Sequence, residues 1–229
     1  MTSSAGRGEK GQRPRILVAL LRRSLGRSWG IRAARFYAGL LSVGVVAAVG
    51  FSAGGLGAND GSLSLVARSA AMLVWIPGAV CALALATPPK DAGLAQGIAA
   101  LAAAHGFDSR RLARAEMVAS VRLLAEVILA PLILMGLFVF LVLAKGGLLA
   151  MARPLVGSIL FGLVAAFVLG LVASICRSWG GERGRSWLAA IVLGPWLVAE
   201  VALSGRLAPY VSIPGLLGRL WEAVAAVPT

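Results

Sequence analysis

Residues 155–176 read LVGSILFGLVAAFVLGLVASIC, an apolar run that contains no charged residue. A helix needs about 20 mostly apolar residues to cross the hydrocarbon core of a bilayer. Five stretches of the chain meet or approach this length: Phe36 to Ala58, Leu65 to Ala86, Val121 to Ala144, Leu155 to Cys176 and Trp187 to Ser204. The sequence therefore predicts an all-α fold, a polytopic membrane helix bundle of five to six transmembrane helices with an N-terminal interfacial amphipathic helix.

The sixth stretch, residues 207–227, is the least regular. It contains Pro209, Pro214, Arg219 and Glu222, and it is better interpreted as an amphipathic segment at the membrane surface. If it does not cross, the C-terminus lies outside the cell; if it crosses, the C-terminus lies inside.

The overall composition also indicates a membrane protein. Of the 229 residues 59% are hydrophobic and 14% are charged, and the mean hydropathy is +0.88. A soluble domain of this length needs more polar surface to cover its core. The chain also has 29 glycines, which membrane helices tolerate because neighbouring helices satisfy the backbone.

The positive charge has an uneven distribution. The net charge is +13, but nine of the 22 basic residues precede the first long apolar run, where they would meet lipid headgroups rather than nucleic acid. With five spans and the N-terminus inside, 17 basic residues fall on the inner side and 5 on the outer side. The positive-inside rule therefore predicts a cytoplasmic N-terminus, in the inner (plasma) membrane.

The first 35 residues form a basic amphipathic leader. Apolar residues from Ile16 to Ile31 alternate with arginines from Arg22 to Arg35, so one helix face can enter the acyl boundary while the arginines reach phosphates. We expect the leader to lie flat on the inner leaflet. A role as a topology anchor alone is an equal alternative, and a secretory signal peptide is not expected because the charged region is too long.

A cytoplasmic segment, residues 87–116, separates the second and third spans. Pro88 and Pro89 end the second span, a short helix is expected from Ala92 to Ala104, and Gly106 closes it. Asp108 or Ser109 can cap the following helix. The expected helix–turn–helix element is rich in alanine, which favours either docking of another protein or rest against the bilayer.

The fourth span carries a small residue at every fourth position. These residues stay nearly on one helix face, so a second helix can approach closely there. The face is expected to form an internal or subunit contact, and its members are Ser158, Gly162, Ala166, Gly170 and Ser174.

Few ionisable residues fall within the spans. Arg122 and Glu126 are four residues apart on one helix face and can pair where the third span enters the membrane. Glu200, near the outer end of the fifth span, is either a functional intramembrane carboxylate or a side chain that reaches the outer interface. Cys81 and Cys176 are expected to be free, buried thiols.

Motifs for catalysis are missing from the sequence. It contains no G-x-x-x-x-G-K-[ST] phosphate loop, no H-E-x-x-H and no C-x-x-C, and His105 is the single histidine. We therefore expect no enzyme activity, no cofactor and no metal site, and a protein that moves, anchors or gates something.

The order of these pieces resembles the membrane subunit of ABC transporters, in particular the type-2 exporter permease family. The resemblance rests on the leader, two spans, Asp91 and Gly93 before the short helix, the His105–Phe107 turn and the basic helix Ser109–Glu116. It implies export coupled to a separate ATP-binding subunit through a coupling helix, and a homodimer or a pair with a homologous permease. The coupling residues it implies are Asp91, Gly93, Leu94, Gly97, Leu101 and Gly106.

Two other functions are compatible with the sequence. The chain could be a membrane scaffold or assembly subunit without transport activity. It could also be an ion-driven transporter, which would need Glu200 to face a cavity.

Overall fold

The computed structural model describes residues 6–55, 60–87, 92–143 and 148–202, and residues 216, 219, 220 and 223. These residues form helices and no strands, so the fold is all-α in this part of the chain. The α-helices are α1 (Gly6–Gly26), α2 (Trp29–Gly55), α3 (Asp60–Ala86), α4 (Ala92–Ala104), α5 (Ser109–Leu143), α6 (Leu148–Gly180) and α7 (Gly184–Ala202), and a short 3₁₀ helix, Gly181–Arg183, joins the last two. The amphipathic segment predicted at residues 207–227 lies almost wholly outside the described residues.

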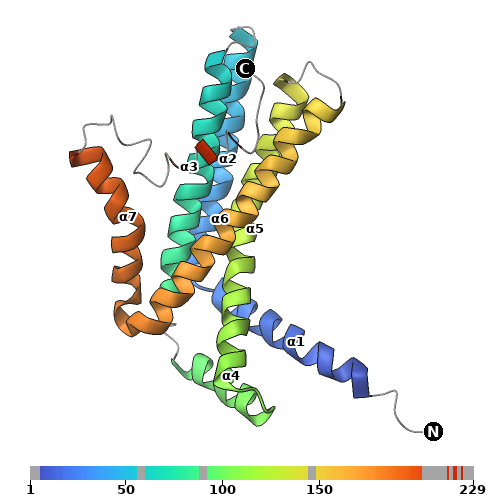
Figure 1. Ribbon diagram of the computed structural model, residues 1–229, viewed down its shortest axis with the longest axis vertical. Helices are drawn as coiled ribbons and strands as arrows, with labels where there is room; N and C mark the ends of the chain where they lie inside the picture. Colours follow the sequence, from blue (N-terminus) through green and yellow to red (C-terminus); the bar gives the residue numbers. More distant parts are fainter. Residues whose placement is uncertain are drawn as a thin grey trace.

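The long helices form a bundle. In Figure 1, α2, α3, α5 and α6 run side by side, α7 stands beside them, and α1 and α4 lie across one end. Each of the five predicted spans overlaps one of the long helices. Two segments, Ser109–Leu134 in α5 and Val156–Gly180 in α6, are long and apolar enough to cross a membrane. Crossing by the other three helices stays a prediction.

Helices pack closely where glycine replaces a side chain. A Cβ added to Gly170 of α6 would lie 2.7 Å from Val121 Cγ2 and 3.1 Å from Val121 Cα on α5, so the two backbones nearly touch. A Cβ on Gly30 of α2 would lie 2.6 Å from the Cβ of Ala84 on α3. Between helices in lipid the attraction comes from close packing and not from the hydrophobic effect, so these crossings hold the bundle together.

The small-residue stripe of α6 is one side of the α5–α6 contact. Ser158, Gly162, Ala166 and Gly170 are buried and Ser174 is partly buried. A Cβ on Gly162 would meet the ends of two leucine side chains of α5, at 2.7 and 2.8 Å. The stripe is therefore an internal contact, one of the two alternatives that the sequence left open.

The opposite face of α6 is exposed and apolar. Its side chains are large and about half exposed, and they recur at intervals of three or four: Val156, Leu160, Leu163, Val164, Phe167, Val168 and Ile175. An apolar face of this length is unfavourable in water but matches the hydrocarbon of a bilayer. α6 thus turns its small-residue stripe towards α5 and these large apolar side chains outward, which favours a lipid environment.

The close approach at Gly170 gives a test. Gly170→Ala should lower the free energy of unfolding by about 1–2 kcal/mol, because overpacking costs ~1–3 kcal/mol and helix propensity returns up to ~1 kcal/mol. The matched control is Gly39→Ala on α2, where nothing lies within 4 Å of an added Cβ. The control should be neutral or slightly stabilising in a detergent unfolding titration. Equal behaviour of the two variants would contradict the α5–α6 packing.

Candidate functional site

The candidate site is the elbow between α4 and α5. α4 spans Ala92–Ala104, as the sequence predicted, and Gly106 follows it with φ of 74°. The amide of Phe107 donates to Ala102 O and the amide of Gly106 donates to Ala103 O, both at 2.9 Å. This pair of bonds is the Schellman motif, and glycine fits its left-handed position without strain. The turn between the two helices is therefore fixed by the backbone.

The second helix of the elbow begins directly after this turn. The carbonyl of Asp108 accepts hydrogen bonds from the amides of Arg111 and Leu112, at 2.9 and 3.0 Å, so Asp108 occupies the N-cap position of α5. Asp108 was one of the two predicted caps. Figure 1 shows that the elbow lies at the same end of the bundle as α1.

The outer surface of α4 is open. Gly97 is exposed with nothing within 4 Å of an added Cβ, and the side chain of Leu101 is 53% exposed. Gly93 and Leu94 lie in α4, but their burial is outside the described part. Asp91 lies outside the described residues altogether. Of the six predicted coupling residues, the structure thus places Gly97 and Leu101 on the free surface and Gly106 in the turn.

The inner surface of α4 packs against α1 and α5. Ala102 of α4 is 2% exposed and belongs to a small apolar cluster, with Ile98 and Phe107 partly buried at its edge. The remaining members come from α1 and α5: Leu17, Val18, Leu21, Ala115 and Ala119. The elbow and the leader therefore share one core, separate from the core of the long helices.

This cluster divides the apolar residues of the leader into two sets. Leu17 and Leu21 face the protein, whereas Ile16 and Leu20 are 58% and 45% exposed. The single lipid-facing surface expected from the sequence is therefore narrower than predicted, because α4 and α5 cover part of it.

The leader also ends earlier than expected. α1 stops at Gly26, and α2 begins at Trp29, so Trp29–Arg35 form the first two turns of α2. Ser28 caps α2, since its Oγ accepts from the amide of Ile31 at 3.4 Å. The Arg27–Ser28 break lets α1 run along the end of the bundle while α2 enters it.

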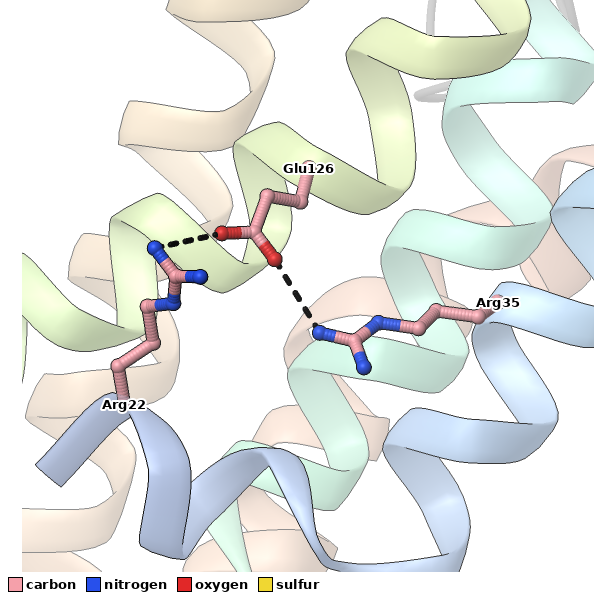
Figure 2. Close-up of polar contacts among 3 residues, drawn as sticks. All are labelled: Arg22, Arg35 and Glu126. Carbon is pink, nitrogen blue, oxygen red and sulfur yellow. Dashed lines mark hydrogen bonds and ion pairs between the residues drawn. The ribbon is translucent and has the colours of Figure 1, made fainter. Parts of the chain in front are cut away.

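A carboxylate joins the leader to two long helices. Glu126 of α5 forms ion pairs with Arg22 of α1, at 3.2 Å, and with Arg35 of α2, at 3.1 Å (Figure 2). The two arginines reach the carboxylate from opposite sides, and each contacts a different oxygen. The predicted partner, Arg122, is exposed and does not contact Glu126 in the described structure, so that pairing was wrong. Arg122 and Glu126 have a spacing that allows an ion pair on one helix face. In the structure, however, Arg22 of α1 and Arg35 of α2 occupy the two carboxylate oxygens of Glu126.

Sequence reasoning missed Arg22 and Arg35 as partners of this carboxylate. A signal was present: Glu126 is the one acidic residue inside the inner half of a predicted span, and the leader supplies an excess of arginine. Which arginines meet it depends on the Arg27–Ser28 break, and no sequence pattern gave the direction of α1 beyond it.

The remaining predicted residues take no part in this site. Glu200 lies in α7, but its side chain is outside the described part. Cys81 and Cys176 are free and buried, as predicted. No group of three metal-ligating side chains occurs among the described residues.

Comparisons of the chain with protein-family models, with curated proteins and with solved structures find no match.

Neutralising the carboxylate should loosen the leader. Glu126→Gln removes the charge from two partly exposed ion pairs, each worth about 0.2–1 kcal/mol, so amide exchange in α1 should increase. The matched control is Glu116→Gln on the same helix, since Glu116 makes no ion pair with a described residue. Hydrogen–deuterium exchange by mass spectrometry measures both.

Charge reversal sharpens this experiment. Glu126→Arg should increase exchange in α1 further, and adding Arg22→Glu and Arg35→Glu should restore protection. Failure of the triple reversal to restore it would show that the ion pairs do not hold α1.

Proposed function

We propose that this chain is the membrane-spanning subunit of an ATP-driven exporter, coupled to a separate ATPase through α4. The observation that carries the proposal is an exposed, alanine-rich helix that a fixed turn holds at one end of a helix bundle. The outer faces of this bundle are apolar and suit a lipid environment. The type-2 exporter resemblance of the sequence points to the same element.

The positions of charged and aromatic side chains support insertion with this end inside. Between residues 15 and 185, every arginine with a described side chain lies at this end of the bundle: in α1, in the α1–α2 connection, in the nearer half of α2, α5 or α7, in the last turn of α6, or in the α6–α7 connection. Trp29, Trp179 and Trp187 are at least 60% exposed, and they lie at the N-terminus of α2, the C-terminus of α6 and the N-terminus of α7, which share one end of the bundle. Tryptophan marks the headgroup level of either leaflet, and an excess of arginine marks the cytoplasmic side.

The packing supports a route for mechanical coupling. A force on the outer face of α4 acts on the small apolar cluster that Ala102 shares with α1, since α4 has little other packing. α1 is tied through Arg22 to Glu126 and from there to Arg35 on α2. Closure of two ATPase subunits would thus tilt α1 and α2 together against the other long helices.

The proposal includes a second copy of the chain or a homologous permease. One chain offers one α4, whereas ATP-driven closure requires two ATPase subunits that approach each other. The transported substrate is expected to be hydrophobic or amphipathic because few polar groups occur in the predicted spans.

The orientation is tested with a reporter fused after residue 100, in α4. A reporter that works only in the cytoplasm should be active in this fusion, and a reporter that works only outside the cell should be inactive. In a separate experiment, the protein should stay in the membrane pellet after treatment with alkaline carbonate. An external reporter signal, or carbonate extraction, would refute the placement of α4.

Coupling is tested by co-purification of an ATPase with the tagged protein. Leu101→Asp introduces a charge on the exposed face of α4, and it should reduce the captured ATPase and the export rate by about tenfold without loss of the folded protein. The matched control, Ala113→Asp, changes an exposed position of α5 in the same elbow and should retain both. A wild-type protein that captures no ATPase, together with a silent Leu101→Asp, would instead indicate a membrane scaffold.

A further inference from the structure

The turn between α6 and α7 is held in one conformation by its glycines. Gly181 has φ of 50°, and the amide of Gly184 donates to Gly181 O. A Cβ on Gly184 would lie 2.6 Å from Cys176 O and 3.1 Å from Ala86 O, so three chain segments meet at this residue. The side chains on either side of the turn therefore have fixed directions.

Two tryptophans flank this turn and point outward. Trp179, in the last turn of α6, is 88% exposed, and Trp187, in the first turn of α7, is 60% exposed. In water, an indole exposed to this extent would bury little of its apolar surface against the protein. At a bilayer surface its apolar body and its N–H group both find suitable surroundings.

Arginines lie between the two tryptophans in sequence. Arg183 and Arg185 are exposed, and neither forms an ion pair or a hydrogen bond with a described side chain. Arg177, partly buried, precedes Trp179. The turn therefore presents two free guanidinium groups beside two exposed indoles.

The tryptophans also mark where exposed apolar surface begins. Along α7, exposed Ile191, Leu197, Val198 and Val201 follow Trp187, and the distance from Trp187 to Val201 is about 21 Å at 1.5 Å per residue. Along α6, Ile175 and the exposed face already described lead away from Trp179. Arginine, then tryptophan, then aliphatic side chains is the order expected from headgroup to hydrocarbon.

We propose that the α6–α7 turn is a binding surface for acidic phospholipids of the inner leaflet. Arg183 and Arg185 contact the headgroup phosphate, and Trp179 and Trp187 lie at the boundary between headgroups and acyl chains. Guanidinium groups bind phosphate oxygens through paired N–H donors. Zwitterionic and anionic lipids both carry such a phosphate, but only the anionic lipid has a net negative charge that attracts both arginines. The inference rests on membrane insertion in the proposed function and is independent of ATPase coupling.

A lipid fits this surface better than an acidic protein surface does. A protein partner would leave the apolar faces above both tryptophans uncovered, whereas a lipid covers indole, acyl-facing side chains and arginine together. The fixed turn supports this, since the arginines reach the headgroup level without a conformational change.

The test uses the purified full-length protein and two lipids that differ in charge. Native mass spectrometry after incubation with equimolar phosphatidylglycerol and phosphatidylcholine should show preferential retention of phosphatidylglycerol. Arg183→Gln combined with Arg185→Gln should reduce that preference about tenfold or more. The matched control is Arg110→Gln with Arg111→Gln, two adjacent exposed arginines of the elbow without neighbouring tryptophans, and it should keep the preference.

A second measurement locates the tryptophans. The fluorescence of Trp179 is the difference between the wild-type protein and Trp179→Phe. Lipids brominated near the top of the acyl chain should quench this fluorescence more strongly than lipids brominated near the chain end. Inorganic phosphate at the same concentration should not displace phosphatidylglycerol, which separates a lipid site from a site for free phosphate.

Three outcomes would overturn the inference: equal retention of the two lipids by the wild-type protein, an equal loss in both arginine double variants, or displacement by inorganic phosphate. Loss of ATPase capture with lipid preference intact in the double variant would identify a protein partner and also overturn it. Failure of the proposed function is distinguishable, because it would remove ATPase capture from the wild-type protein and leave lipid preference unchanged.

Discussion

The close approach of α6 to α5 is the contact on which the bundle depends. Lipid competes equally for large apolar side chains, so two membrane helices gain most where small residues let their backbones meet. At Gly170 the α5 backbone at Val121 lies only 3.1 Å from where a Cβ would be. The same crossing fixes the level of Glu126, five residues further along α5. The position of the charged site therefore follows from the packing of uncharged helices.

The charged site connects two parts of the protein that pack separately. The long helices have one apolar core, and α1, α4 and the start of α5 have another. Leu25 packs at the edge of both cores, and Glu126 of α5 links α1 to α2 through its two ion pairs. Because partly exposed ion pairs contribute little free energy, these pairs are better suited to fixing direction than to adding stability. In the proposed coupling, they would allow the leader to transmit tilt without making it a rigid part of the bundle.

Sequence patterns predicted elements better than contacts. Ala92–Ala104, Gly106 and the stripe from Ser158 to Ser174 follow from local rules of helix ending and periodicity, and the structure has them where expected. The partners of Glu126 could not be predicted, because they depend on the angle between α1 and α2 at Arg27–Ser28, which no local rule gives. The same applies to Leu17 and Leu21: periodicity placed them on an apolar face, but it could not distinguish a face covered by lipid from one covered by α4.

The two surfaces at the basic end differ in a way that separates their roles. The exposed residues of α4 are uncharged and mostly small, Leu101 excepted, and the helix has little backbone contact with its neighbours, so the proposed ATPase could move it. Around the α6–α7 turn the exposed residues include two tryptophans and two arginines, and Gly184 lies tightly against two backbone carbonyls, so the turn resists movement. The proposed coupling to an ATPase needs both a movable element and a fixed point at the membrane surface. The fold supplies them on different helices, with the α5–α6 contact between them.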